Sequence, residues 1–324
     1  MLRDPFGRTI DYLRVSVTDR CDLRCVYCMP PEGVPLKPIA DILTYDELIR
    51  TVRVAVSLGV RKVRITGGEP LVRRGVVGFV RRVAEIHGVR DLGMTTNGTA
   101  LPGMAAALRE AGLRRVNISL DTIRRDRYAE ITRRDALPKV LEGIDAALRA
   151  GLSPVKINVV LLHGLLPGEV EDFLAMAREM PVKVRFIERM PIGCPPSEGY
   201  VSAGGVRERI LALPGVREAR DGTSSAAVTY EVPGFAGKLG VISPVSRKFC
   251  ADCNRLRVTA DGRLRSCLFG RETLDLRAVL RGGGGDDAVA DLLRRAVRTK
   301  PQGHALCDGG DAPSDAEPMS RVGG

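Results

Sequence analysis

Cys21-Asp-Leu-Arg-Cys25-Val-Tyr-Cys28 places three cysteines within eight residues, directly after the short β-rich run Arg14-Val-Ser-Val-Thr18. Thiolates spaced this closely favour a soft metal ion or a metal cluster. A structural zinc ion would need a fourth ligand nearby, but the next cysteine is Cys194 and the first histidine is His87. A four-iron cluster is normally held by four thiolates, so three cysteines would leave one iron free to bind a small molecule. A zinc site completed by a distant ligand and a group of reduced thiols are the alternatives.

Strands and helices alternate along the chain after these cysteines. The capping-box pattern Thr44-Tyr-Asp-Glu47 predicts the start of a helix that continues to about Leu58. We then predict strands at 63–66, 92–96, 116–120, 155–162 and 182–187, separated by helical segments at 75–86, 101–111, 124–150 and 168–179. Because parallel strands need crossover connections, this alternation indicates βα units and a parallel sheet. The sequence therefore predicts an α/β fold, an incomplete (βα)6 TIM-like barrel with its functional loops at the carboxyl ends of the strands.

The pattern changes after Pro191, where short strand signals are interrupted by Pro195-Pro196, by the small polar residues 221–226 and by Pro233-Gly234. We predict three parts: the barrel at 1–194, a C-terminal α+β extension at 195–308 and a flexible tail at 309–324. The tail is rich in Gly, Asp, Pro and Ser, a composition that favours disorder.

A second group of cysteines lies in the predicted extension. Cys250 and Cys253 are separated by two residues, and Cys267 follows after a predicted hairpin turn at Asp261-Gly262, which would return it toward the first two. The spacing fits a zinc site, for which one of the two remaining cysteines could supply a fourth ligand. It fits a second iron–sulfur cluster equally well.

Composition limits the kinds of partner. The 324-residue chain is 44% apolar and 27% charged, as in ordinary globular proteins. Its formal charge of +11 suggests an anionic partner, such as a phosphorylated metabolite, a nucleic acid or an acidic protein. The chain has no Trp and few Phe and Tyr, so it is poorly supplied with aromatic platforms on which single-stranded bases stack, and we expect no nucleic acid partner. We also expect no membrane, a reducing cytoplasmic location and no disulfides, since neither a signal peptide nor a long apolar run is present.

The motifs taken together resemble the GTP 3′,8-cyclases of molybdenum cofactor biosynthesis, a family of radical S-adenosylmethionine (SAM) enzymes. The resemblance covers nearly the whole chain: the Cys21–Cys28 loop, Thr66-Gly-Gly-Glu-Pro70, Thr95-Thr-Asn-Gly98, Ser119-Leu-Asp121, Phe186-Ile-Glu-Arg-Met190, Phe249-Cys-Ala-Asp-Cys-Asn-Arg-Leu-Arg257 and the terminal Gly323-Gly324. The first two motifs are shared by many radical SAM enzymes. The Cys-x2-Cys-Asn-Arg-x-Arg segment and the terminal di-glycine are more specific.

The resemblance implies two [4Fe-4S] clusters and SAM as cofactors. The first cluster would be held by Cys21, Cys25 and Cys28, and its open iron would chelate SAM, which an electron then splits into methionine and a 5′-deoxyadenosyl radical. The second would be held by Cys250, Cys253 and Cys267 and would use its open iron to hold the purine of GTP. Tyr27, Gly68, Ser119 and Met190 would line the SAM site.

The substrate implied by the resemblance, GTP, carries a triphosphate, yet the sequence has no Gly-x4-Gly-Lys-Ser/Thr loop. Convergent basic side chains must then hold the phosphates, a task for which Arg is well shaped. A basic residue on a barrel strand needs a partner or a ligand, because burying an unpaired charge is costly. Our candidates are Arg14, Lys62, Arg64, Thr95, Lys156, Arg255 and Arg257. Each could instead face outward or pair with an acid such as Glu188.

The implied reaction removes hydrogen from C3′ of GTP and joins C3′ to C8, giving (8S)-3′,8-cyclo-7,8-dihydroguanosine 5′-triphosphate. In the family the terminal Gly323 and Gly324 reach the active site, so we include them as catalytic residues. The expected partners are GTP, SAM, an unidentified electron donor, a downstream pterin synthase and a second copy of the chain in a homodimer. The alternatives are a radical SAM enzyme that modifies a peptide and a zinc-stabilised protein that binds nucleic acid.

Overall fold

The computed structural model describes residues 1–162, 168–190, 192, 201–219, 226–270, 273–304 and 318–322. Its described strands form one sheet in the order β12-β11-β10-β1-β2-β3-β4-β5-β6-β9-β8-β7. The strands are β1 Tyr12–Ser16, β2 Lys62–Thr66, β3 Asp91–Thr96, β4 Arg115–Ser119, β5 Val155–Leu161, β6 Val182–Glu188, β7 Arg217–Ala219, β8 Val228–Glu231, β9 Lys238–Ile242, β10 Arg255–Val258, β11 Arg263–Arg265 and β12 Leu274–Asp275. The run from β10 to β9 is parallel, and the strands beyond it are antiparallel.

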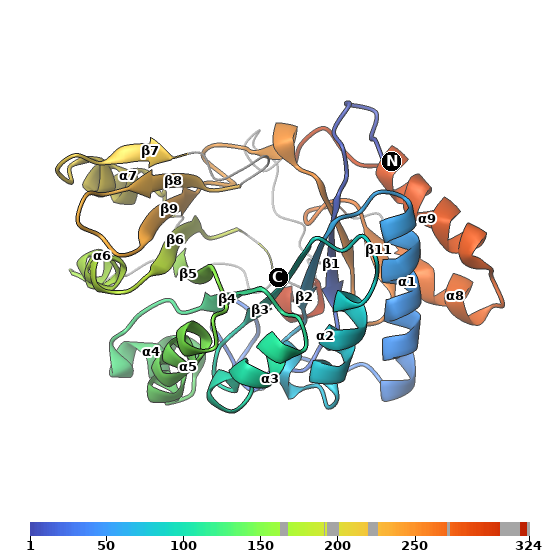
Figure 1. The fold of residues 1–324 in the computed structure, drawn as a ribbon, viewed down its shortest axis with the longest axis horizontal. Coiled ribbons are helices and arrows are strands. Elements are labelled where there is room, and N and C mark those ends of the chain that lie inside the picture. The colour runs from blue at the N-terminus through green and yellow to red at the C-terminus, as the bar shows by residue number, and fades with distance from the viewer. Residues whose placement is uncertain are drawn as a thin grey trace.

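Helices cover the outer face of this sheet (Figure 1). They are α1 Tyr45–Ser57, α2 Val76–Ala84, α3 Ala105–Glu110, α4 Arg125–Thr132, α5 Leu137–Arg149, α6 Glu169–Glu179, α7 Gly204–Leu211, α8 Leu276–Arg281, α9 Asp286–Arg298 and α10 Met319–Val322. The predicted capping box is present at the start of α1: Thr44 Oγ1 accepts from the Glu47 N–H at 3.2 Å, and the Glu47 carboxylate accepts from the Thr44 N–H at 2.6 Å. The predicted helix at 101–111 is divided, because Pro102 and Gly103 confine its first turn to a 3₁₀ segment.

The two faces of the parallel strands differ in polarity. Side chains alternate across a strand, and Val63 and Ile65 of β2 are fully buried on the helix side. Arg64 and Thr66 of the same strand line a cavity on the other side, as do Asn117 of β4 and its neighbours. Parallel sheets are usually apolar on both faces. The polar inner face therefore indicates a binding cavity on this side of the sheet.

The C-terminal part does not form a sheet of its own. Strand β9 pairs in parallel with β6, and β10 pairs in parallel with β1, so the C-terminal strands lengthen the N-terminal sheet at both edges. The structure is a mixed α/β fold, a parallel sheet with a C-terminal antiparallel extension. Among the described residues, no helix combines the length and the apolar character that a membrane crossing requires.

Candidate active site

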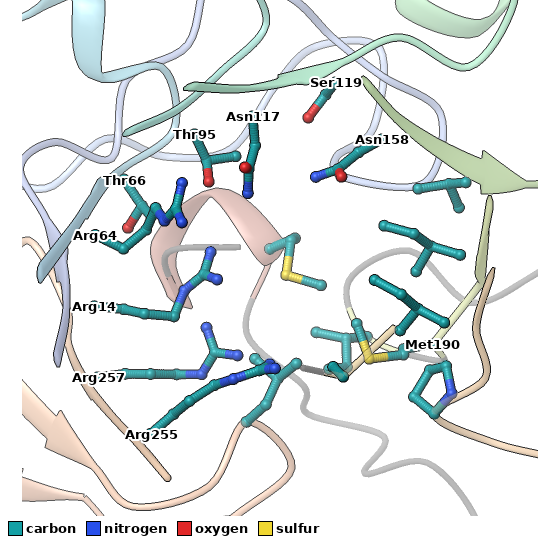
Figure 2. A pocket seen from close by; sticks show the side chains of 18 of the residues that line it. Arg14, Arg64, Thr66, Thr95, Asn117, Ser119, Asn158, Met190, Arg255 and Arg257 are labelled. Carbon is teal, nitrogen blue, oxygen red and sulfur yellow. The ribbon is translucent and has the colours of Figure 1, made fainter. Parts of the chain in front are cut away.

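A cavity of about 680 Å³ lies on the inner face of the sheet. In Figure 2 the side chains of Arg14, Arg64, Arg255 and Arg257 enter it from one side, and Met190 lies opposite. Every predicted site residue in the described part of the chain lines this cavity: Arg14, Cys21, Cys25, Tyr27, Cys28, Lys62, Arg64, Gly68, Thr95, Ser119, Lys156, Met190, Cys250, Cys253, Arg255, Arg257 and Cys267. Gly323 and Gly324 lie outside the described residues.

The first cysteine loop follows β1 and is held by the end of α4. The N–H groups of Cys28 and Met29 both donate to the carbonyl of Cys25, at 2.9 and 3.2 Å. Arg133 adopts a left-handed conformation, with φ at 54°, and its guanidinium donates to the carbonyls of Arg24 and Met29, both at 2.9 Å. These contacts close a compact turn around the three sulfurs.

Two acids, the buried Asp121 and the exposed Asp22, fix the loop to neighbouring strand ends. The Tyr27 hydroxyl donates to Asp121 at 2.7 Å, and the same carboxylate accepts from the N–H of Val160 at 2.8 Å. Burial raises the pKa of Asp121 to about 6. On the other side, Asp22 accepts from Asn97 at 2.7 Å, which ties the loop to the turn after β3.

Gly68 is needed because the chain entering the cysteine loop passes directly over it. A Cβ atom at Gly68 would lie 2.3 Å from the carbonyl oxygen of Arg20. The N–H of Gly68 donates to the carbonyl of Thr18 at 2.7 Å, which also holds this turn against the chain entering the loop. Next to it, Glu69 is buried and accepts from Thr96 Oγ1 at 2.7 Å and from the Asn97 N–H at 2.6 Å, and burial raises its pKa to about 7.

The second cysteine group is brought together by the predicted hairpin. Strands β10 and β11 are antiparallel, and Gly262 has the left-handed φ of 81° that their turn requires. Cys267 follows β11 and lines the cavity with Cys250 and Cys253. Burial alone would raise the pKa of Cys253, but the charges of Lys300 and Arg255 outweigh it and lower the pKa. The shift favours the thiolate of Cys253 relative to an isolated cysteine, whereas burial raises the pKa of Cys250.

The six cavity cysteines are free and half-buried. In the part of the chain that the structure describes, no group of three His, Cys, Asp or Glu side chains is arranged around a single metal ion. The donor chemistry of each group fits an iron–sulfur cluster, because thiolates are its usual ligands. The cationic surroundings described next would balance the charge of such a cluster.

Arginines occupy facing positions on three adjacent strands. Arg257 of β10, Arg14 of β1 and Arg64 of β2 are aligned in register. The next position, Gly93 of β3, leaves room for Arg64, since a Cβ there would lie 2.8 Å from its guanidinium. Burial lowers the pKa of Arg14 to about 10. Like charges directly opposite one another on neighbouring strands are destabilising. A bound polyanion would offset this repulsion, so the row of arginines indicates a polyanion site.

The positive charge continues onto the later strands. Burial, followed by the charge of Arg185, lowers the pKa of Lys156 to about 7. Burial and the charge of Arg64 lower the pKa of Arg185 to about 9. Arg115 belongs to the same wall but is paired with Asp91. Lys62 is likewise paired, with its Nζ 3.5 Å from Asp11, so it is less available to a ligand than the other candidates.

Tyr12 lies among these cations. Its hydroxyl accepts from Arg64 Nε at 3.0 Å, and the Arg255 guanidinium lies 6.0 Å from its ring centre. Burial would raise the pKa of Tyr12, but Arg64, Arg14 and Arg255 outweigh it and bring the pKa down to about 7. The lowered pKa of Tyr12 therefore follows from the positive charge of the surrounding cavity.

Several buried polar atoms of the cavity lack hydrogen-bond partners among the described residues. They are Thr66 Oγ1, Thr95 Oγ1, Asn117 Oδ1 and Arg255 Nε. A buried polar group without a partner costs about 1–3 kcal/mol. All four residues are seen in Figure 2 around one space, which indicates that a polar ligand completes their hydrogen bonding.

Sequence reasoning missed several cavity residues: Tyr12, Arg115, Asn117, Asn158 and Arg185. Four of them, Tyr12, Arg115, Asn117 and Asn158, had a signal in the period of two along each strand, since each shares a face with a residue that was predicted. Asn158 lies two residues after the predicted Lys156 on β5, whereas Arg185 of β6 has no predicted residue on its strand face. Glu188, considered as a partner for the basic residues, accepts from the N–H groups of Ala203 and Val245 at 3.1 Å and so secures two loops.

The last described segment also reaches the cavity. Met319 and Ser320 of α10 line it, and Val322 is 2% exposed. The Arg321 guanidinium donates to the carbonyl of Pro35. The residues just before Gly323 are thus held beside the site.

Comparisons with known proteins agree with this arrangement. The sequence pattern of the radical SAM superfamily matches residues 15–177, and that of the Molybdenum Cofactor Synthesis C family matches residues 182–306. The chain is 46% identical to the GTP 3′,8-cyclase of Moorella thermoacetica and 47% identical to that of Pelotomaculum thermopropionicum, with 100% of each chain covered.

A solved structure supports the fold. SuiB from Streptococcus suis, crystallised with S-adenosylmethionine, superposes with a TM-score of 0.61 at 14% identity, over 90% of this chain and 66% of SuiB. At that identity the likeness concerns the fold alone. The full-length sequence relatives carry the assignment: this chain belongs to the GTP 3′,8-cyclase family of the radical SAM superfamily.

Proposed function

We propose that the chain is a GTP 3′,8-cyclase that converts GTP to (8S)-3′,8-cyclo-7,8-dihydroguanosine 5′-triphosphate in molybdenum cofactor biosynthesis. The observation that carries this proposal is the shared cavity. One space contains both cysteine groups and an in-register row of arginines, so a cofactor and a polyanionic nucleotide would meet within it. The curved sheet corresponds in this proposal to the incomplete (βα)6 barrel, with the C-terminal extension at its edges.

The cofactors are two [4Fe-4S] clusters and SAM. Cys21, Cys25 and Cys28 hold the first cluster, and Cys250, Cys253 and Cys267 hold the second. When bound, the first cluster and SAM supply the radical chemistry. Four residues that line the cavity would position SAM: Tyr27, Gly68, Ser119 and Met190. The hydrogen bond from Tyr27 to Asp121 fixes the tyrosine side chain.

The chain holds GTP mainly by charge and hydrogen bonds. Five basic side chains line the cavity and would bind the triphosphate: Arg14, Arg64, Lys156, Arg255 and Arg257. The Thr95 hydroxyl, which has no hydrogen-bond partner among the described residues, would bond to a phosphate or ribose oxygen. Lys62 stays a weaker candidate because of Asp11. We add Arg185, whose lowered pKa follows from burial beside Arg64 and is relieved by a nearby anion.

We also propose an orientation for the substrate in the cavity. The purine lies toward the second cysteine group and the ribose toward the SAM side, so that C3′ and C8 are held within one rigid pocket. Holding both reacting carbons in place supplies much of the rate enhancement that a protein can give to a ring closure. We keep Gly323 and Gly324 as proposed catalytic residues, as the family resemblance implies.

The remaining partners are an unidentified electron donor, a downstream pterin synthase that takes up the product, and a second copy of the chain in a homodimer. We place the enzyme in the cytoplasm. We divide it into a radical SAM part at 1–194, an auxiliary-cluster and substrate part at 195–308 and a tail at 309–324.

An anaerobic turnover assay tests the proposal. Reconstituted protein, a chemical reductant, SAM and GTP should yield methionine, 5′-deoxyadenosine and a product with the mass of GTP. Omission of GTP should leave only slow SAM cleavage. If 5′-deoxyadenosine forms but no GTP isomer is found by mass spectrometry, the assigned substrate is wrong.

A further inference from the structure

The N-terminal turn lies against the second cysteine group, although the two are about 240 residues apart in the sequence. Asp4 is buried, and its carboxylate accepts from the N–H groups of Phe6 and Arg8 at 3.0 and 2.9 Å. Gly7 has a left-handed φ of 80°, which allows the tight turn. This turn fixes the backbone from which the Arg8 side chain projects.

The Arg8 guanidinium joins three segments of the chain. Its Nε donates to Asp4, its Nη1 donates to the carbonyls of Cys250 at 2.6 Å and Gln302 at 2.9 Å, and its Nη2 donates to the carbonyl of Pro301 at 2.6 Å. The side chain is 8% exposed. A planar fork with several donors suits this arrangement, and a lysine could not make all of these bonds at once.

Lys300 binds the segments that carry the other two cysteines, Cys253 and Cys267. It is 3% exposed, and its Nζ donates to the carbonyl of Arg255 at 2.9 Å and to that of Ser266 at 2.5 Å. Arg255 is two residues after Cys253, and Ser266 directly precedes Cys267. Lys300 therefore connects the segment that carries Cys253 to the segment that carries Cys267.

The residues Lys300–Gln302 are thus a common anchor for all three cysteines. Arg8 attaches this anchor to Cys250, and Lys300 attaches it to the segments of the other two. Both groups also place a buried positive charge beside three sulfur ligands. Second-shell hydrogen bonds and charges of this kind orient the ligands of a metal centre and set its reduction potential.

We propose that Arg8 and Lys300 are positioning residues of the second cysteine site, which hold its three segments in place and balance the charge of the cluster bound there. This proposal rests on the proposed function, in that the site must carry a cluster. Neither residue lines the substrate cavity, so neither is expected to contact GTP.

The test uses the full-length protein, reconstituted without oxygen. The variants are Arg8→Gln, which removes the charge, Arg8→Lys, which keeps it, and Lys300→Met, which keeps the chain length. Exposed arginines of the same two regions give the controls Arg3→Gln and Arg298→Gln. We measure iron per chain, the electron paramagnetic resonance signals that respond to SAM and to GTP, and the reduction potential of the GTP-responsive signal.

Arg8→Gln and Lys300→Met should lose about half of the iron, from about eight to about four per chain, and should lose the GTP-responsive signal. Their SAM-responsive signal should persist. Any second cluster that remains should have a more negative potential, and Arg8→Lys should retain more of it than Arg8→Gln. Both controls should match the unmodified protein.

Three results would overturn the proposal. Unchanged iron and potential in Arg8→Gln and Lys300→Met would show that the two residues do not act on the cluster. Loss of both clusters together would indicate a general structural role. An unmodified protein that binds only about four irons per chain would instead reject the second cluster itself, and with it the proposed function on which this inference rests.

Discussion

GTP should bind more weakly as the pH rises through neutrality, and Lys156 should account for much of the change. Burial, with Arg185, Arg115 and Arg64 nearby, lowers the pKa of Lys156 from 10.5 to about 7. This shift corresponds to about 5 kcal/mol against the charged amine in the empty cavity. A bound triphosphate would favour the charged form and raise the pKa again, so binding above pH 7 should take up a proton.

The size of the effect follows from linkage. A group that titrates near pH 7 in the free protein and stays charged in the complex weakens binding by about 15-fold between pH 7 and pH 8.5. The lowered pKa values of Tyr12 and Lys183, each about 7, act in the same direction, because Tyr12 gains a negative charge and Lys183 loses its positive charge as the pH rises. In the empty protein the sign is opposite: between about 7 and 10.5 the unfolded state holds more protons at Lys156, so its contribution to stability rises with pH.

Isothermal titration calorimetry of GTP, without oxygen, measures both quantities. Titrations from pH 6.5 to 8.5 give the slope of affinity, and buffers with different ionisation enthalpies give the protons taken up. Lys156→Met should show weaker binding at pH 7 and a shallower slope, whereas Lys139→Met, which removes an exposed lysine of α5, should match the unmodified protein. The terminal phosphate of GTP also titrates in this range, but its effect on the slope is the same for the unmodified protein and both variants. Equal slopes in Lys156→Met and the unmodified protein would refute the reasoning.

Three further predictions concern the cysteines, the arginines and the tail. Cys25→Ser should abolish the formation of 5′-deoxyadenosine, while Cys250→Ser should retain uncoupled SAM cleavage but lose GTP conversion; product assays would expose the opposite pattern. Arg255→Ala and Arg257→Ala should each weaken GTP binding by about 1.5–3 kcal/mol per charged hydrogen bond lost, with SAM affinity unchanged in the same calorimetric titrations. Deletion of Gly323-Gly324 should spare GTP affinity and stop turnover, and normal turnover in that variant would show that the tail has no catalytic part.

The fold was predictable where the signals are local. The six strands from β1 to β6 were each predicted to within about two residues, since their apolar and polar residues alternate clearly. Strands β9 and β10 were not assigned to this sheet. They are short, and their partners β6 and β1 lie far away in sequence, so only the tertiary pairing decides where they belong.

The site was predictable to the extent that its chemistry lies in short motifs. The cysteine spacings and the basic residues on strands pointed to one shared cavity. Arg185 was missed because a single basic residue on a strand carries no motif, and the register that aligns Arg257, Arg14 and Arg64 is visible only in the sheet. Arg8 was missed for the same reason, since its partners Cys250 and Gln302 are brought to it by folding alone.

The most direct test of the central claim follows a single hydrogen atom. If GTP and SAM meet in this cavity as proposed, GTP carrying deuterium at C3′ should transfer it to 5′-deoxyadenosine during turnover, and mass spectrometry should find that nucleoside heavier by about one mass unit. The account predicts this transfer together with the formation of a GTP isomer that lacks the label at C3′. 5′-Deoxyadenosine without deuterium, formed while GTP is consumed, would contradict it.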